Sequence, residues 1–414
     1  MTTMARRART GAREVARLDA EDRSAALREI AAALEGGADE ILRANTKDLE
    51  RADERGVTGP LRDRLKLDKE GVLGIAAAVR EIAGQEDPLG RIEDEHVRPN
   101  GLRVGRMRIP LGVVAMIYES RPNVTADAAA LCLRAGNAVI LRGGSEAIHS
   151  NRAIAEAVRA GLARSSVPVD AVQLVPTTER EAVDALLRQE DTIDLVIPRG
   201  GESLIRAVTE KSRIPVLQHF KGVCHMYLDA SAPAERADEL VLNAKVQRPG
   251  VCNALETLLV HRDAAARLLP RLADRLSDAG VALRGCPATL SVLSDRRVRP
   301  ATEDDWKAEY LDLILAVRIV DDLEDALEHI ATYASGHTEA IVTDDEEAAR
   351  VFVEAVQSST VLVNASTRFA DGGELGLGAE IGISTSKLHA YGPMGARELT
   401  TRKFVVFGDG QVRA

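Results

Sequence analysis

The sequence predicts an α/β protein with parallel sheets, and three observations lead to this fold class. Residues 12–52 carry apolar side chains at three- and four-residue spacing, which indicates helices. From residue 112 onward, short apolar runs alternate with amphipathic segments, as in strands that are joined by crossover helices. A second series of the same kind begins near residue 230. We therefore expect an N-terminal helical segment followed by two α/β regions.

Composition sets limits on the class of protein. A chain of 414 residues is too long for one hydrophobic core, and 45% hydrophobic residues are enough for two or three packed domains. The net charge of −10 argues against a protein that binds nucleic acid or an anionic membrane. We see no signal peptide and no apolar run long enough to span a bilayer.

Cysteine spacing points to a reducing compartment. The four cysteines lie far apart, without a C-x-x-C pair or the spacing of a metal site. A disulfide framework is therefore not expected, and neither is a bound metal. Reduced thiols favour a cytoplasmic protein.

The helical segment gives way to a hairpin and then to the first α/β series. In "HVRPNGLRVGRMRIPLG" the pair Asn100-Gly101 separates two β-type runs, which is a hairpin signal. The apolar run "GVVAMIY" predicts a buried strand. Further strands are expected at residues 137–142, 171–176, 193–201, 214–220 and 222–229, with helices at 123–136, 145–163, 178–189 and 202–212. A ligand of such a sheet binds at the carboxyl ends of the strands.

The second α/β series runs to about residue 364. Strands are expected at residues 257–261, 313–322, 338–345 and 359–364, with helices at 263–280, 323–335 and 346–356. The remaining tail is rich in Gly, Ser and Thr and ends in a strand-like run at 403–408.

Cys252 stands out within "NAKVQRPGVCNALETLLVH". Pro249-Gly250 predicts a tight bend before it, and the run after it can start a helix. A thiolate at a helix N-terminus is favoured by the exposed amides and the helix dipole, and the same amides can stabilise an oxyanion. A nucleophile is one interpretation. A buried structural cysteine, the usual fate of this residue type, is the other.

Two Gly-rich turns follow predicted strands and precede helices. The first, in "GNAVILRGGSEAIHSN", places Arg142 at the strand end, where it could pair with a phosphate. The second, in "IPRGGESLI", repeats the geometry with Gly200 and Gly201. Neither is a G-x-G-x-x-G motif, so an ordinary strand-turn-helix explains each equally well.

A long polar loop is expected at residues 363–385, "VNASTRFADGGELGLGAEIGIST". Its hydroxyls, its asparagine and Arg368 could grip a small polar substrate, while the alternative is a solvated connection. Loops of this length in a compact domain usually have a function.

The order of these blocks resembles the aldehyde dehydrogenase superfamily over nearly the whole chain. The resemblance is carried by "IPLGVVAMIYESRPNVTADAAALCLRAGNAVILRGGSEAIHSN", "QRPGVCNALETLLVH", "LVNASTRFADGGELGLGAEIGISTSKLHAYGPMGARELTT" and the ending "GDGQVR". Within the superfamily they are most similar to the branch that reduces L-glutamyl 5-phosphate to L-glutamate 5-semialdehyde in proline biosynthesis. The implied fold is a Rossmann-like cofactor domain, an α/β catalytic domain and a small oligomerisation element.

The resemblance assigns roles to residues of this chain. Cys252 falls at the family's catalytic thiol, and Arg142 falls where general members hold the cofactor's ribose, so that an arginine would suit the 2′-phosphate of NADP(H). Glu309 falls near the glutamate that contacts the nicotinamide ribose. The expected cofactor-binding residues are Arg142, Gly143, Gly144, Ser145, Gly200, Gly201 and Glu309.

The oxyanion position has two candidates. An ungapped count from Gly112 places the family's oxyanion asparagine at Arg121, whereas Asn123 lies two residues on. The sequence does not choose between them. The substrate's α-carboxylate and α-amino group also need partners, and the substrate-binding candidates are Arg121, Asn364, Ser366, Thr367 and Arg368.

One departure from the family pattern bears on the reaction. Aldehyde-oxidising members carry a glutamate that activates water, but the corresponding stretch, "VLQHFKGVCHMYLD", has no acidic residue before Asp229. The resemblance therefore implies a thioester on Cys252 that is made and resolved by phosphate, with NADPH as the reductant.

The resemblance also implies the domain organisation. Residues 1–228 are expected to form the NADP(H)-binding domain, with an oligomerisation hairpin at about 94–110. Residues 229–365 are expected to form the catalytic domain, and residues 366–414 to return to the cofactor domain and add an oligomerisation strand. A dimer or tetramer follows from these strand edges, and the lability of the acyl phosphate favours a transient contact with glutamate 5-kinase.

Two alternatives remain at this point. The chain could act on a different semialdehyde or acyl phosphate, or it could be an inactive scaffold that kept the fold. The intact "QRPGVCN" block and the Gly-rich turns count against the scaffold, because a scaffold has no need of the thiol. Fold alone does not separate these hypotheses.

Overall fold

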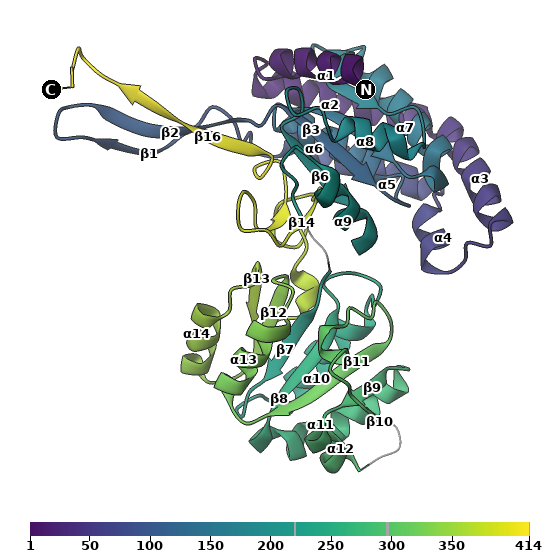
Figure 1. Ribbon diagram of the computed structural model, residues 1–414, viewed down its shortest axis with the longest axis vertical. Helices are drawn as coiled ribbons and strands as arrows, with labels where there is room; N and C mark the ends of the chain where they lie inside the picture. Colours follow the sequence, from purple (N-terminus) through teal and green to yellow (C-terminus); the bar gives the residue numbers. More distant parts are fainter. Residues whose placement is uncertain (219–220, 295–297, 414) are drawn as a thin grey trace. The chain divides into compact units, whose positions relative to one another are not determined.

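The computed structural model describes residues 1–218, 221–294 and 298–413, and its chain divides into two compact units. The first unit comprises residues 1–218, 376–383 and 393–414, and the second comprises residues 219–375 and 384–392. Figure 1 shows the chain coloured along its length, with its helices and strands labelled. No helix in the described part of the chain is both long and apolar enough to cross a membrane.

The first unit is built on a four-stranded parallel sheet in the order β5-β4-β3-β6. Its strands are β3 (Val113–Tyr118), β4 (Ala138–Gly143), β5 (Val172–Leu174) and β6 (Leu195–Arg199). All side chains of β3 are buried, as expected for an apolar strand between two neighbours. The helices are α1 (Thr2–Val15), α2 (Ala20–Gly36), α3 (Ala38–Glu54), α4 (Pro60–Leu65), α5 (Lys69–Gly84), α6 (Val124–Arg134), α7 (Ile148–Leu162), α8 (Arg180–Leu186) and α9 (Glu202–Lys211), with short turns η1 (Ser145–Ala147) and η2 (Val169–Ala171).

The N-terminal helices form as the sequence predicts. The Asp19 carboxylate accepts the Asp22 backbone N–H at 2.8 Å and caps α2, and Asp68 does the same for α5 through Gly71 N–H at 2.8 Å. The Gly36-Gly37 pair marks the break between α2 and α3. Local capping chemistry therefore defines where these helices begin and end.

The predicted hairpin pairs with the C-terminal strand in a separate sheet of the first unit. β1 (Ile92–Val97), β2 (Arg103–Pro110) and β16 (Thr400–Phe407) are antiparallel in the order β1-β2-β16, and the turn contains Gly101 at a φ of 85°. Figure 1 shows these three strands as a long ribbon that extends from the helices of this unit. Val97 and Phe404 on it are each 67% exposed.

The second unit has a seven-stranded parallel sheet in the order β10-β9-β11-β8-β7-β12-β13. The strands are β7 (Cys224–Leu228), β8 (Leu255–His261), β9 (Ala282–Gly285), β10 (Val298–Pro300), β11 (Ile314–Val320), β12 (Thr338–Val342) and β13 (Thr360–Val363). The helices are α10 (Ala234–Val246), α11 (Arg262–Asp278), α12 (Pro287–Leu293), α13 (Leu323–Tyr333) and α14 (Glu346–Ala355), with turns η3 (Asp305–Lys307) and η4 (Thr367–Phe369). Two short strands, β14 (Gly382–Ser384) and β15 (Gly392–Met394), pair with each other.

The unit boundaries differ from the predicted domain boundaries. The first boundary was expected after residue 228, but β7 pairs with β8 and β12 inside the second sheet, so the change of unit falls at residues 218 and 219. The segment 214–220 was expected to be a strand; within its described part it forms a single bridge from Val216 to Val196, and residues 219–220 lie outside the description. The tail expected to rejoin the first domain at 366 does so only for residues 376–383 and 393–414.

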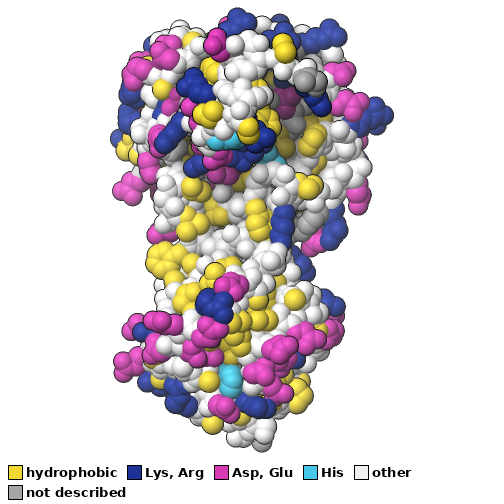
Figure 2. Space-filling model, turned by 90° about the vertical axis from the view of Figure 1, so that its left-hand side faces the viewer, with side chains coloured by type: hydrophobic (Ala, Val, Ile, Leu, Met, Phe, Trp, Pro, Cys, Tyr) yellow, Lys and Arg dark blue, Asp and Glu magenta, His cyan; other side chains and the backbone are white. Residues whose placement is uncertain are grey.

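The surface carries both signs of charge. Figure 2 shows acidic and basic side chains interspersed over the face it presents. The excess of acidic residues, 64 against 54 basic, gives the net charge of −10.

Candidate active site

Cys252 lies in the loop between α10 and β8, and the expectation that a helix follows it was wrong. The residues from Leu255 onward form β8, which is hydrogen-bonded between β7 and β11 with nearly all of its side chains buried. Pairing on both sides of a central strand outweighs the local preference of a short segment. A helix dipole after Cys252 therefore does not activate its thiol. The thiol is partly exposed, whereas Cys132 and Cys224 are buried.

The backbone of Cys252 is fixed by residues that precede β7. Gly222 packs so closely against the Cys252 carbonyl that a Cβ at position 222 would collide with its oxygen, carbon and Cα. The Cys224 thiol also donates to the Cys252 carbonyl oxygen at 3.2 Å. Burial holds the pKa of Cys224 well above its usual value, so its sulfur stays protonated and remains a donor.

Glu309 reaches the same place from the loop before β11. Its Oε1 accepts the Gly222 backbone N–H at 2.8 Å. The sequence lacks an acid in the stretch around Gly222, but the fold supplies a carboxylate to that stretch from a distant segment.

A buried ion pair joins α10 and β8, the two elements that flank the Cys252 loop. Lys245 Nζ at the end of α10 lies 2.6 Å from Glu256 Oε2 on β8, and both side chains are completely buried. Glu256 Oε1 also accepts the Leu311 backbone N–H at 3.2 Å. Burial raises the pKa of Glu256 to about 7 and lowers the pKa of Lys245, so each charge depends on the other.

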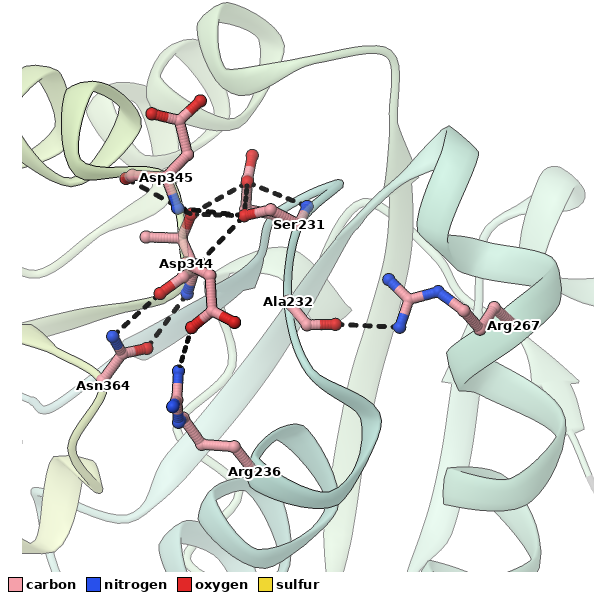
Figure 3. Close-up of polar contacts among 9 residues, drawn as sticks. Ser231, Ala232, Arg236, Arg267, Asp344, Asp345 and Asn364 are labelled. Carbon is pink, nitrogen blue, oxygen red and sulfur yellow. Dashed lines mark hydrogen bonds and ion pairs between the residues drawn. The ribbon is translucent and has the colours of Figure 1, made fainter.

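Two of the predicted substrate-binding side chains serve the local fold. The Asn364 amide accepts the Thr343 N–H at 3.0 Å and donates to the Thr343 carbonyl at 2.8 Å. Figure 3 shows this pair of bonds beside the polar cluster around Ser231. The Ser366 hydroxyl is buried and accepts the Arg368 backbone N–H at 3.3 Å, which caps η4. Hydrogen bonds within the chain therefore engage both side chains.

Of the remaining candidates, Arg368 contacts residues on both sides of Cys252 in the sequence, and Thr367 directly precedes Arg368. The Arg368 carbonyl accepts from Asn253 Nδ2 at 3.4 Å, and Arg368 Nε donates to Gln247 Oε1 at 2.7 Å. Thr367 is completely buried, and its hydroxyl has no hydrogen-bond partner within the described part of the chain. Burial lowers the pKa of the Arg368 guanidinium, and the neighbouring Arg248 charge lowers it further.

In the first unit, Arg121 and Asn123 form the turn between β3 and α6. The Arg121 carbonyl accepts the Val124 N–H at 3.1 Å, and Asn123 Nδ2 donates to the Asp127 carboxylate at 2.8 Å. Ser120, just before this turn, has a φ of 46°. Burial raises the pKa of Asp127 to about 6. One amide N–H of Asn123 is thus engaged by Asp127.

The turn after β4 carries the predicted cofactor residues Arg142, Gly143, Gly144 and Ser145. Arg142 donates through Nη2 to the Thr178 carbonyl at 2.9 Å, while its buried Nε has no partner among the described residues. Gly143 packs against the buried Asn151 amide, where a Cβ would collide with Nδ2. A cation with an unpartnered N–H next to a turn that only glycine fits suits a phosphate-bearing cofactor.

Carboxylates cover both Gly-rich turns of the first unit. Glu146 Oε1 accepts the Ser120 hydroxyl at 3.1 Å and stands over Gly144. Glu119 Oε2 accepts the Gly201 N–H at 3.1 Å and stands over Gly200. The amide of Gly201 is therefore engaged by Glu119, and a phosphate at this second turn would have to displace that carboxylate.

The structure thus groups the predicted residues within each unit. Because β3, β4 and β6 are parallel, with Tyr118 paired to Gly143 and to Arg199, the turns after them share one edge of the sheet. In the second unit, Arg368 and Glu309 contact residues on the Cys252 loop or packed against it. Sequence reasoning missed the supporting residues Gly222, Gln247, Arg248 and Asn253, although three of them stand in or beside the quoted "QRPGVCN". Among the described residues, no group of three or more His, Cys, Asp or Glu side chains could hold a metal ion.

The chain matches known proteins over nearly its full length. The model of the aldehyde dehydrogenase family matches residues 1–283. A protein of Nitratidesulfovibrio vulgaris named gamma-glutamyl phosphate reductase is 57% identical over 410 residues, which cover 99% of this chain and 98% of that protein. A protein of Xanthomonas oryzae with the same name is 56% identical over 411 residues, covering 99% of each.

Solved structures agree with these matches. The crystal structure of a gamma-glutamyl phosphate reductase from Thermotoga maritima has a TM-score of 0.96 at 44% identity, covering 100% of this chain and 99% of that one. An acetylating aldehyde dehydrogenase from Geobacillus thermoglucosidasius has a TM-score of 0.71 at 18% identity, covering 100% and 97%. The second likeness is one of fold alone.

Proposed function

The chain belongs to the aldehyde dehydrogenase family, and we propose that it reduces L-glutamyl 5-phosphate to L-glutamate 5-semialdehyde with release of phosphate, a step of proline biosynthesis. The observation that carries this proposal is the 55–57% identity, over 99% of the chain, to proteins named gamma-glutamyl phosphate reductase. Fold alone would not carry it, because one fold supports many reactions.

Cys252 is the proposed nucleophile. Its sulfur attacks the γ-acyl carbon, a C–S bond forms, and the C–O bond to phosphate breaks with the electron pair leaving on phosphate. Partial exposure of Cys252 supports this role, as does a backbone held by Gly222 and Cys224. The negative charge that develops on the acyl oxygen needs N–H donors, for which backbone amides near Cys252 and a side chain at 121 or 123 are the candidates.

A nicotinamide cofactor is expected from the family, and we propose NADP(H). When bound, it supplies the hydride that reduces the Cys252 thioester. The proposed cofactor-binding residues are Arg142, Gly143, Gly144, Ser145, Gly200, Gly201 and Glu309. The unpartnered Nε of Arg142 supports a 2′-phosphate partner at this turn. After reduction, cleavage of the C–S bond frees the semialdehyde and returns Cys252 as a thiolate, so that this step itself needs no proton.

The remaining proposals concern substrate and assembly. Arg121, Asn364, Ser366, Thr367 and Arg368 are proposed to bind the substrate, although the bonds of Asn364 and Ser366 make these two the weakest members. The exposed apolar side chains on the β1-β2-β16 sheet support self-association into a dimer or tetramer. A transient contact with glutamate 5-kinase would protect the acyl phosphate, and the four free cysteines support a cytoplasmic location.

A specific observation favours one alternative reaction. Glu309 brings a carboxylate to Gly222, beside the Cys252 backbone, and a carboxylate there could activate water to hydrolyse the thioester. The chain would then oxidise a semialdehyde without phosphate. The engagement of Glu309 by the Gly222 amide counts against this role.

The reverse reaction separates these proposals. Purified protein is given L-glutamate 5-semialdehyde and NADP, with and without inorganic phosphate, and cofactor reduction is followed by absorbance. We expect reduction only with phosphate, and none in Cys252→Ala, which should still bind NADP. Reduction that ignores phosphate would establish water as the acceptor, and substantial turnover by Cys252→Ala would exclude the covalent route.

A further inference from the structure

We propose that Arg248 and Arg368 together bind the phosphate group that leaves from, or attacks, the acyl carbon at Cys252. This inference rests on the proposed function, since it names the subsite of that reaction that holds phosphate. It also reassigns Arg368, for which the sequence suggested the substrate's α-carboxylate.

The backbone and the side chain of Arg368 each contact a residue near Cys252. Asn253, the neighbour of Cys252, donates through Nδ2 to the carbonyls of Arg368 and Ala370, at 3.4 Å and 3.0 Å. Gln247, on the other side of the loop, accepts from Arg368 Nε at 2.7 Å. A guanidinium fixed through Nε keeps its terminal nitrogens together on one side, which is the arrangement that binds two oxygens of one anion.

Arg248 adds a second positive charge to the same loop. It is an exposed residue that directly follows Gln247. The hydrogen bond from Arg368 Nε to Gln247 brings Arg368 next to the residue that precedes Arg248. In agreement, the charge of Arg248 lowers the pKa of Arg368, whereas that of Cys252 raises it. Two guanidinium groups repel each other unless an anion lies between them.

No ion pair holds either guanidinium within the described residues, although the nearby charge of Asp371 raises the pKa of Arg368. Other exposed arginines of the second unit form ion pairs, such as Arg236 with Asp344 and Arg350 with Glu347. Neither Arg248 nor Arg368 forms an ion pair within the part of the chain that the structure describes. Two neighbouring cations that form no ion pair among the described residues, beside a nucleophile, can bind an anion with their free N–H groups.

The chemistry of the substrate indicates which anion binds there. The phosphate group is joined through one oxygen to the carbon that the sulfur attacks, whereas the α-carboxylate lies at the far end of the glutamyl chain. A cation pair next to Cys252 therefore meets the phosphate. As the C–O bond breaks, negative charge grows on the departing phosphate, and two guanidinium groups stabilise that charge through bidentate hydrogen bonds. In the reverse direction the same pair holds the incoming phosphate.

The first test compares the phosphate dependence of variants in the reverse reaction. We expect Arg248→Met to raise the KM for phosphate about 10-fold or more, the loss of one charge-assisted hydrogen bond. Arg248→Lys should recover part of the affinity for phosphate, because lysine keeps the positive charge but lacks the paired N–H donors of the guanidinium. The KM values for NADP and semialdehyde should stay unchanged. Arg236→Met removes an exposed arginine of the same unit and is the matched control, with an unchanged KM for phosphate.

The outcomes of this test are distinguishable from failure of the proposed function. If wild-type protein shows no phosphate requirement, the proposed function itself fails. If wild type needs phosphate and Arg248→Met has the wild-type KM for phosphate, the inference alone is overturned. If the KM for the semialdehyde rises instead, Arg248 and Arg368 bind the α-carboxylate, and the inference is equally overturned.

A second measurement does not depend on turnover. Iodoacetate, an anion, and iodoacetamide, which is neutral, alkylate the same thiol, and the modification of Cys252 is followed by peptide mass spectrometry. In wild type, phosphate should slow alkylation by iodoacetate more than alkylation by iodoacetamide. In Arg248→Met, two quantities should fall several-fold. One is the rate of alkylation by iodoacetate relative to that by iodoacetamide, and the other is the extent to which phosphate slows alkylation. Equal protection in the variant and in wild type would overturn the phosphate site.

Discussion

The glycines next to the candidate site residues of the two units contact different kinds of atoms. In the first unit, Gly144 and Gly200 face the carboxylate tips of Glu146 and Glu119, which are ends of flexible side chains. In the second unit, Gly222 faces the backbone of Cys252. A side-chain tip can move when a ligand arrives, whereas a backbone carbonyl in a packed loop cannot. The turns of the first unit are therefore adjustable, and the Cys252 loop is fixed.

Contacts between distant parts of the chain hold the turns of both units. In the first unit, Glu119 accepts the Gly201 N–H across 82 residues, and Glu146 accepts the Ser120 hydroxyl across 26 residues. The Cys252 loop is held by segments far apart in the chain, among them Gly222, Glu309 and Arg368. The position of Cys252 is thus set by tertiary contacts, and substitutions far from Cys252 in the sequence should alter it.

The largest effect is expected from breaking the buried pair under the Cys252 loop. Lys245→Met leaves Glu256 buried without its partner, which should cost about 3–5 kcal/mol of unfolding free energy. Replacing both residues by apolar ones, as in Lys245→Met with Glu256→Leu, should recover most of that loss. Urea unfolding of the two variants at pH 8, followed by circular dichroism, measures both quantities. A double variant that is as unstable as the single one would show that the loop needs the ionic pair itself.

A glycine comparison gives the next largest effect. Gly222→Ala forces the Cys252 backbone to shift, and a displacement of about 1 Å at a reacting group can cost about 100-fold in rate. Gly74→Ala, in α5, has open space around its Cβ and is the matched control, with near-wild-type activity. The measurement is kcat in the phosphate-dependent reaction, with the melting temperature as a check on folding. Equal kcat values for the two variants would mean that the Cys252 loop adjusts to the added Cβ and is not fixed.

The sequence predicted the features that arise from local chemistry. The helices expected over residues 12–52, the hairpin at Asn100-Gly101 and the Gly-rich turns after β4 and β6 follow from short patterns, and the structure has each of them. The α/β class followed from the alternation of apolar and amphipathic runs, and it is confirmed by the two parallel sheets.

Errors arose where partners distant in the chain decide the structure. The helix expected after Cys252 is strand β8, because β7 and β11 pair with it from both sides. The boundary expected after residue 228 assigned β7 to the wrong unit, because an apolar strand does not reveal which sheet it joins. Glu309 supplies a carboxylate that no reading of the stretch around Gly222 could find, since the contact spans more than eighty residues, 222 to 309.

The smallest effect probes whether the adjustable turn of the first unit also responds to pH. Burial raises the pKa of Asp127, which holds Asn123, from 3.8 to about 6. Because its pKa is raised in the folded state, the neutral form of Asp127 stabilises the fold. This contribution to the unfolding free energy is complete below pH 3.8 and is lost as the pH rises through 6. Asp127→Asn is neutral at every pH and keeps a hydrogen-bonding partner for Asn123. After allowance for its partial exposure, the variant should be about 1–2 kcal/mol more stable than wild type at pH 7.5 and equal to it near pH 4. Urea unfolding of both proteins at the two pH values measures this difference. The same difference at both values would mean that Asp127 does not titrate in this range, and that the turn before α6 is as insensitive to pH as a loop fixed by backbone contacts.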